Sequence, residues 1–273
     1  HLSNKDLAYM MINGDVRELR GFLLPRMQMK KIEDCVDIPP LDETVHYIEI
    51  SEAEADLQRL NVEDDELDFS TKIQTARKML LNPATVDVFP AIVPSKAIAL
   101  NNILQESFVT SEKVVIFVID FKEEVLTGKS TIEDFLTLPD DVSIRWIHGD
   151  TEIHKERYRI QQEFQDPGSG RILLIVNGMV TDVGVDFSAA DEAIIYNEGW
   201  TVSEKRQEIG RCHRPGRTKS LKVHTLIAAG TVETAMHQYA KKKESAISKL
   251  LYGVPLSELE QNLLKAAEDD GSD

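Results

Sequence analysis

Residues 177–233 read NGMVTDVGVDFSAADEAIIYNEGWTVSEKRQEIGRCHRPGRTKSLKVHTLIAAGTVE, and this stretch decides the fold of the chain. Gln207, Arg211 and Arg214 lie between two of its apolar runs, at spacings of four and three, on one face of a predicted helix. Two guanidinium groups on one face can converge on one anion, which indicates a phosphate-binding cluster. Ion pairing with surface carboxylates is the competing interpretation, because the chain has 47 acidic residues, and the spacing alone does not decide between the two.

Short apolar runs recur from residue 113 onward and predict strands. They are VVIFVI (114–119), SIRWI (143–147), RILLIV (171–176), AIIY (193–196) and KVHTLI (222–227). Amphipathic stretches such as HKERYRIQQEF separate them. Runs that are apolar on both faces and alternate with helices predict an α/β fold, a parallel sheet with helices on both faces. Ligands of such sheets bind beyond the carboxyl ends of the strands, so we expect the functional loops after residues 119, 147, 176, 196 and 227.

The flanking regions are predicted to be mainly helical. A helix and irregular chain open the sequence, and a strand is expected around residues 45–50. Ser51 and Glu54 form a capping box at the start of the next helix, and further helices are expected over 72–81 and 95–108. After Gly230 a long helix and an acidic tail complete the chain.

Composition limits the kinds of partner. The 273 residues are 42% hydrophobic, carry a formal net charge of −16 and have a pI near 4.9. A global positive field for nucleic acid is therefore excluded, and any contact with nucleic acid must be local. The sequence has two distant cysteines, no apolar run of about 20 residues and no signal-peptide pattern. These features predict an intracellular protein without membrane association. Because the sequence begins with His1, we expect it to be a piece of something longer.

Several apparent sites do not meet their chemical requirements. Gly128-Lys129-Ser130 resembles the end of a P-loop, but Glu123 occupies the place of its first glycine and would repel phosphate. The acidic pair 191–192 precedes its strand, which is the wrong side for a magnesium site, and the histidines lack metal-ligand spacing. No metal site is therefore predicted.

The stretch from Gly184 to Glu233 resembles the last two motifs of the SWI/SNF-type branch of superfamily-two ATPases, which are DNA translocases. That family has an A-A-D strand followed by Trp, then Q-x-x-x-R-x-H-R-x-G-Q, a strand and G-T-x-E. The matching residues here are Ala189-Ala190-Asp191, Trp200, Gln207, Arg211, His213-Arg214, Gly216 and Gly230-Thr231-Val232-Glu233. Weaker similarity extends upstream, through KVVIFVIDF (113–121), HGDTEIHKERYRIQQEF (148–164) and the L-P-P-like connection around residues 22–40.

The resemblance implies a RecA-like second lobe of a two-lobed ATP-driven motor. Residues 1–94 would be the connection between the lobes with a helical extension, 95–230 the lobe itself, and 231–273 C-terminal bracing helices with the acidic tail. ATP would bind between the lobes, with Mg²⁺ held by the absent first lobe, and double-stranded DNA would run across both. The N-terminal motor lobe of the same full-length protein is thus an expected partner, and this chain alone is expected to be inactive.

The resemblance also implies roles for individual residues. Arg211 and Arg214 would be arginine fingers on the transferring phosphoryl group, with Gln207 beside them. Gly184 and Asp186 would lie near the nucleotide and the lobe interface. The expected DNA-binding residues are Phe121, Lys122, Gly149, Thr151 and Thr181.

Two departures from the family pattern leave other functions open. Thr181 and Asp182 replace two glycines in a turn that approaches DNA, and Arg217 replaces the last Gln of the arginine motif. The alternatives are another superfamily-two helicase, of RNA or restriction type, and a non-catalytic interaction module with the helicase-lobe fold. Adjacent His213-Arg214 and the G-T-V-E signature favour the SWI/SNF type.

Overall fold

The computed structural model describes residues 21, 38–64, 66–83, 92–119, 132–149, 151–152, 155–177 and 185–252, with the side chains of 134 and 243–252 excepted. The chain divides into two compact units, residues 1–36 with 238–273 and residues 37–237. The second unit contains the sheet and every site discussed below. The predicted N-terminal helix, the P-loop-like Gly128-Lys129-Ser130 and the acidic tail lie outside the described residues.

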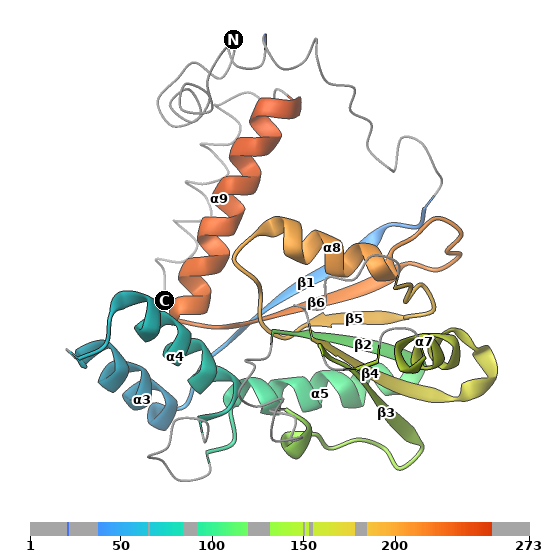
Figure 1. Ribbon diagram of the computed structural model, residues 1–273, viewed down its shortest axis with the longest axis horizontal. Helices are drawn as coiled ribbons and strands as arrows, with labels where there is room; N and C mark the ends of the chain where they lie inside the picture. The colour runs from blue at the N-terminus through green and yellow to red at the C-terminus, as the bar shows by residue number, and fades with distance from the viewer. Residues whose placement is uncertain are drawn as a thin grey trace. The chain divides into compact units, whose positions relative to one another are not determined.

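A six-stranded parallel sheet forms the centre of the second unit (Figure 1). Its strand order is β1-β6-β5-β2-β4-β3, and every neighbouring pair is parallel. The strands are β1 (Leu41–Ile48), β2 (Lys113–Val118), β3 (Val142–Ile147), β4 (Arg171–Asn177), β5 (Glu192–Ile195) and β6 (Leu221–Ala228). The predicted parallel α/β fold is confirmed, with strand ends within a residue or so of the apolar runs.

Helices cover both faces of the sheet because the central strands are apolar on both sides. Alternate residues of β2 point to opposite faces, so Val114 and Ile116 pack with one core cluster and Val115 and Phe117 with the other. Helix α5 (Ser95–Thr110) covers the first cluster through Leu100, Leu104 and Phe108. Helices α7 (Glu156–Gln165) and α8 (Val202–Cys212) cover the second through Ile160, Phe164, Ile209 and Cys212.

Strand β1 extends the sheet into the segment that we assigned to the connection between lobes. It pairs with β6 from Leu41↔Leu221 to Ile48↔Ala228. Polar residues at Asp42 and Glu43 are tolerated because an edge strand has one free side. The sheet therefore includes residues 41–48, which precede the 95–230 range predicted for the lobe.

The remaining α-helices lie before the second strand and after the last, and two 3-10 helices lie between strands. The predicted capping box at Ser51 is present and begins α3 (Glu52–Glu63), while Asp68 caps α4 (Phe69–Leu81). Short 3-10 helices lie at Glu133–Phe135 and Pro167–Ser169. The long helix predicted after Gly230 is α9 (Val232–Tyr252). Within the described part of the chain, no helix has the length and apolar character needed to cross a membrane.

Candidate functional site

Helix α8 carries the arginine cluster and is defined at both ends by its own sequence. Thr201 caps its first turn, with Glu204 returning the hydrogen bond to the Thr201 backbone. The helix ends at Cys212, before a proline and a glycine that cannot continue it. His213 follows at once, and its Nε2 lies 2.7 Å from the carbonyl oxygen of Pro39. The end of α8 is thereby tied to the chain that enters β1.

The structure brings Arg214 close to Asp186, two of the residues predicted to bind the nucleotide. The Nη2 of Arg214 donates to the Val185 carbonyl at 2.8 Å, and its Nε lies 3.8 Å from Asp186 Oδ1. Both side chains remain partly open, at 38% and 39% exposure, so an incoming anion could reach the guanidinium. Gly184, the other predicted nucleotide residue of this loop, lies outside the described residues.

Arg211 and Gln207 differ from Arg214 in their surroundings. Gln207 is exposed on α8, whereas Arg211, one turn later, is only 8% exposed. The backbone carbonyl of Arg211 accepts from Phe187 N at 2.9 Å, which joins the last turn of α8 to the segment containing Asp186. Burial raises the pKa of neighbouring Glu208 to about 7, and the charge of Arg211 opposes that shift. A carboxyl that titrates near neutrality thus accompanies the arginines.

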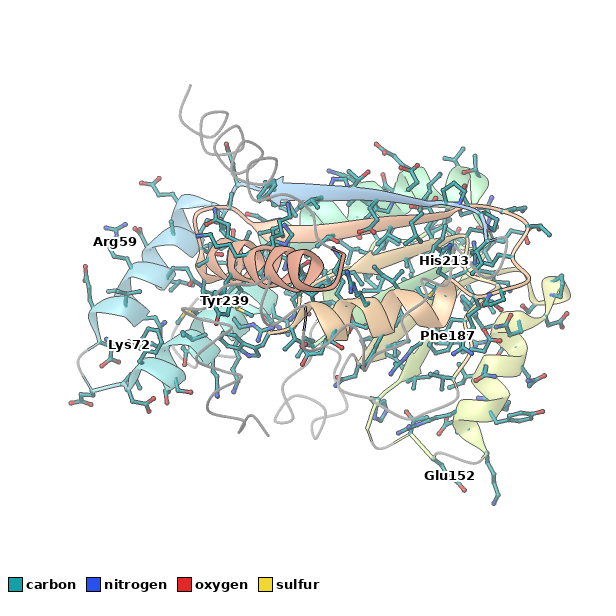
Figure 2. All side chains as sticks on the ribbon, turned by 90° about the horizontal axis from the view of Figure 1, so that it is seen from above. Arg59, Lys72, Glu152, Phe187, His213 and Tyr239 are labelled. Atoms are coloured by element: carbon teal, nitrogen blue, oxygen red, sulfur yellow. The ribbon has the colours of Figure 1, made fainter. Side chains whose placement is uncertain are left out.

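The arginine cluster lies at the amino edge of the sheet. Besides the contact between Phe187 and Arg211, Asp191 N donates to the carbonyl of Lys113, the first residue of β2. Figure 2 shows Phe187 and His213 close together near the end of α8. Our expectation of a site at the carboxyl ends of the strands is therefore wrong for these arginines. Because α8 runs back after β5, its last turn returns to the edge where the strands begin.

Arg217 fixes the turn that follows Asp186. Its Nη1 donates to the carbonyls of Ser188 and Ala190 at 2.7 and 2.8 Å, and to that of Cys212 at 3.2 Å. Gly216 makes this possible, because its φ of 97° lies in the left-handed region that favours glycine. The charge that distinguishes this chain from the family pattern therefore serves the fold, although burial lowers the pKa of Arg217.

The acidic pair at residues 191–192 lies at the amino edge of the sheet, and Glu192 is the first residue of β5 and does not precede the strand as we expected. Asp191 Oδ2 accepts from the backbone N–H groups of Glu112 and Lys113 and so caps the start of β2. Glu192 is buried at the start of β5 and accepts hydrogen bonds from Ser107 of α5 and from Ser111, the residue that follows this helix. Neither carboxylate is near the loops that follow the strands.

The predicted DNA-binding residues are only partly described. Gly149 is exposed in the loop after β3, whereas Thr151 is buried and its Oγ1 accepts from His148 N at 2.9 Å. Thr151 therefore shapes the loop, and the exposed backbone at Gly149 is the part that a phosphate could approach. Phe121, Lys122 and Thr181 lie outside the described residues.

A buried ionic network at the carboxyl edge was not predicted. Lys96 at the start of α5 donates to both carboxylate oxygens of Glu233, at 2.8 and 2.9 Å. Arg77 donates to the Glu198 carbonyl at 2.8 Å, and the Glu198 carboxylate lies 2.6 Å from His237 Nδ1. The G-T-V-E signature drew attention to Glu233, but no sequence pattern marked its distant partner Lys96.

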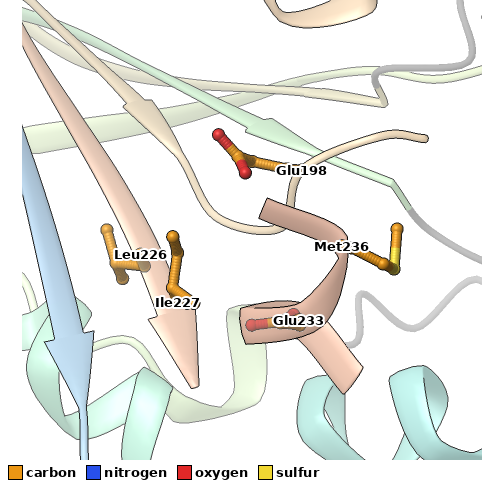
Figure 3. A pocket seen from close by; sticks show the side chains of 5 residues that line it. All are labelled: Glu198, Leu226, Ile227, Glu233 and Met236. Atoms are coloured by element: carbon orange, nitrogen blue, oxygen red, sulfur yellow. The ribbon is translucent and has the colours of Figure 1, made fainter. Parts of the chain in front are cut away.

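A small pocket adjoins this network and is shown in Figure 3. Its lining residues are Glu198, Leu226, Ile227, Glu233 and Met236. Both carboxylates already have cationic partners, so the pocket offers a ligand little beyond apolar contact.

Comparisons with known proteins agree with this architecture. The helicase conserved C-terminal domain family matches residues 95–216. The chain is 27% identical over 144 residues to the ATP-dependent DNA helicase DDM1 of Arabidopsis thaliana. The aligned residues make up 53% of this chain and 18% of that protein. The chain is also 27% identical over 122 residues to the chromatin-remodeling ATPase INO80 of Candida glabrata, covering 45% of this chain and 8% of that protein. The chain thus corresponds to a minor part of these relatives.

Solved structures share the fold. The SWI2/SNF2 ATPase C-terminal domain of Sulfolobus solfataricus matches with a TM-score of 0.55 and 20% identity, over 76% of this chain and 87% of that one. The SWI2/SNF2 ATPase core of the same organism, in complex with double-stranded DNA, matches with a TM-score of 0.57 and 20% identity, over 87% of this chain and 53% of that one. Residues 95–216 thus match the helicase conserved C-terminal domain family, and the chain shares the fold of the SWI2/SNF2 ATPase C-terminal domain.

Proposed function

We propose that this chain is the second motor lobe of an ATP-dependent translocase of double-stranded DNA. The observation that carries the proposal is the pairing of Arg214 with Asp186, partly exposed at the end of α8, within the arginine motif. The names of the relatives, which include an ATP-dependent DNA helicase and a chromatin-remodeling ATPase, support the same activity. Such a protein would work where DNA is, in the cytoplasm, nucleoid or nucleus.

The residues at the amino edge fit a polyphosphate. Among the described residues, the enclosed Nε of Arg214 donates no hydrogen bond, and its approach to Asp186 is long at 3.8 Å. The exposed part of the Arg214 guanidinium can bind a phosphate oxygen while Nη2 stays bonded to the Val185 carbonyl. ATP supplies the phosphoryl group to be transferred. The phosphates and Mg²⁺ would be held mainly by the first lobe of the full-length protein, because this lobe offers cations and no P-loop.

In the proposed mechanism this lobe completes the catalytic site when the lobes close. Arg214 and Arg211 donate to the oxygens on which negative charge accumulates in the transition state, and Gln207 lies beside them. Arginines in this role raise hydrolysis rates by about 10³–10⁵. Opening after hydrolysis would move the lobes along the duplex, and such motions often limit turnover. The isolated chain is therefore expected to hydrolyse essentially no ATP.

Contact with DNA would be made by loops at the carboxyl edge. With a net charge of −16, this chain cannot attract DNA through its overall field, so its own contacts with DNA would be made by backbone N–H groups and a few cations. Gly149 is the exposed candidate among the described residues, and Phe121, Lys122 and Thr181 are the others proposed.

The test is ATP turnover by the full-length protein carrying Arg214→Ala, with Arg211→Ala as a second variant. We expect turnover to fall by about 10³-fold or more, because the lost charge acts mainly in the transition state. Arg206→Ala is the matched control, since Arg206 is an exposed arginine of the same helix. Unchanged turnover in Arg214→Ala would instead support a non-catalytic module.

A further inference from the structure

One face of helix α7 carries three polar residues at intervals of four. Arg157, Gln161 and Gln165 therefore lie in a single row along the helix, and we call this row the α7 stripe. Ile160 and Phe164, on the neighbouring face, are buried in the core beneath the sheet and hold the helix in place. The ten residues of α7 span about 15 Å, so the stripe joins two distant parts of the lobe.

The first residue of the stripe holds the loop after β3. Arg157 is 5% exposed, and its guanidinium donates to the carbonyls of Thr151 at 3.0 Å, Gly149 at 3.1 Å and His148 at 3.2 Å. One rigid, charged fork thus fixes the backbone of the loop that we propose as a DNA contact. Any displacement of this loop must either move the start of α7 or take these three carbonyls away from their donor, Arg157.

The other two residues hold the backbone of Asp186. Gln161 Oε1 accepts from Asp186 N at 3.2 Å, and Gln165 Nε2 donates to Asp186 O at 2.8 Å. Both peptide groups of Asp186 are therefore bound by one helix, while its side chain faces Arg214. Gln165 Nε2 also lies 3.4 Å from Ser188 Oγ, in the same turn.

We propose that the α7 stripe is the mechanical link through which duplex DNA on the 148–151 loop sets the position of Asp186 and Arg214. Gln161 and Gln165 are thus positioning residues for ATP hydrolysis, which they reach through Asp186. The inference rests on the proposed function, since it assigns a role to α7 within that reaction. Coupling through one helix is efficient because its internal hydrogen bonds prevent the two ends from moving independently.

The hydrogen-bond directions give a sharp test with paired variants. Gln161 acts as an acceptor, so Gln161→Glu keeps the bond to Asp186 N, whereas Gln161→Leu loses it. Gln165 acts as a donor, so both Gln165→Glu and Gln165→Leu lose the bond to Asp186 O. A glutamate is therefore tolerated at position 161 and not at position 165, a pattern that helix propensity or charge alone would not produce.

The measurement is the ratio of ATP turnover with saturating duplex DNA to turnover without DNA, in the full-length protein. We expect this ratio to fall about fivefold or more in Gln165→Leu, Gln165→Glu and Gln161→Leu, and to stay near that of the wild type in Gln161→Glu. Gln162→Leu is the control, because Gln162 is exposed on the same helix. Half-saturating DNA concentration and thermal unfolding, measured in parallel, separate loss of coupling from loss of fold.

A ratio in both Gln165 variants equal to that of the wild type would overturn the inference, as would an equal fall in Gln162→Leu. If Gln165→Leu does not fold, the comparison of Gln161→Glu with Gln165→Glu decides on its own. A wild-type protein without DNA-stimulated turnover would refute the proposed function and this inference with it. DNA-stimulated turnover that is unchanged in the Gln165 variants would refute this inference alone.

Discussion

Glu192 is the clearest case of a single residue whose environment sets its ionisation. Burial alone raises the pKa of Glu192, but hydrogen bonds from His224, Ser107, Ser111 and Lys222 outweigh burial and lower the pKa to about 2. His224 in turn lies 3.0 Å from His46 of the edge strand. The carboxylate therefore joins α5 to three neighbouring strands, and its charge stabilises the folded chain.

This ionisation predicts a specific loss of stability in acid. The folded pKa lies below the ordinary value of 4.5, so the unfolded chain takes up the proton first as pH falls. The contribution of Glu192, on the order of 3 kcal/mol, is full above pH 4.5 and is lost as pH falls toward about 2. Glu192→Gln should therefore lower the free energy of unfolding at pH 7 and flatten its pH dependence in that window. Denaturant titrations at several pH values measure both, and parallel pH profiles would contradict the assignment.

Among the elements, the start of α9 depends on one buried ion pair. Lys96 of α5 is 1% exposed and bonds Glu233 in the first turn of α9, and the Glu233 carboxylate also accepts from Ala228 N at 2.9 Å. Burial lowers the pKa of Lys96, and Glu233 opposes that shift. Since both charges are removed from water, each one depends on the other.

Removing only one partner of this pair should be costly. Lys96→Met leaves the Glu233 carboxylate buried without its cation, and we expect a loss of about 3–5 kcal/mol in the free energy of unfolding. The double variant Lys96→Met with Glu233→Leu removes both charges and should lose less. Denaturant unfolding of the wild type, the two single variants Lys96→Met and Glu233→Leu, and the double variant gives the coupling free energy of the pair. Additive effects of the two changes would show that the pair contributes nothing.

The elements were largely predictable from sequence, and their arrangement was less so. The apolar runs identified β2 to β6 because central parallel strands are buried on both faces. Strand β1 was recognised as a strand, but nothing in its half-exposed pattern showed that it pairs with β6. The paired residues Leu41 and Leu221 are 180 positions apart in the sequence. The row formed by Arg157, Gln161 and Gln165 was also overlooked, because only the structure shows what each residue contacts.

The candidate site was predictable in its residues and not in its location. The motif identified Arg214 and Asp186, which the structure brings together. The general rule for parallel sheets placed ligands at the carboxyl edge, whereas α8 returns its last turn to the amino edge. That rule describes a lobe that binds its own ligand. A lobe that contributes arginines to a site held mainly by another lobe need not follow it.

The lobe keeps its two proposed contacts at opposite edges of the sheet. The arginines lie at the amino edge and the 148–151 loop at the carboxyl end of β3, with α7 extending between them. Because of the net charge of −16, any affinity for DNA depends on a few local groups. Since the salt dependence of the affinity scales with the number of phosphate contacts, we expect it to be small. Duplex DNA is thus expected to act on catalysis through position more than through affinity.

We propose above that this lobe serves a motor driven along double-stranded DNA. The most direct measurement is the rate of ATP hydrolysis by the full-length protein with saturating duplex DNA, compared with duplex RNA of the same length and sequence. We predict strong stimulation by DNA, little by RNA, and none with either in Arg214→Ala. Equal stimulation by RNA, or turnover by the isolated 273-residue chain, would contradict the account.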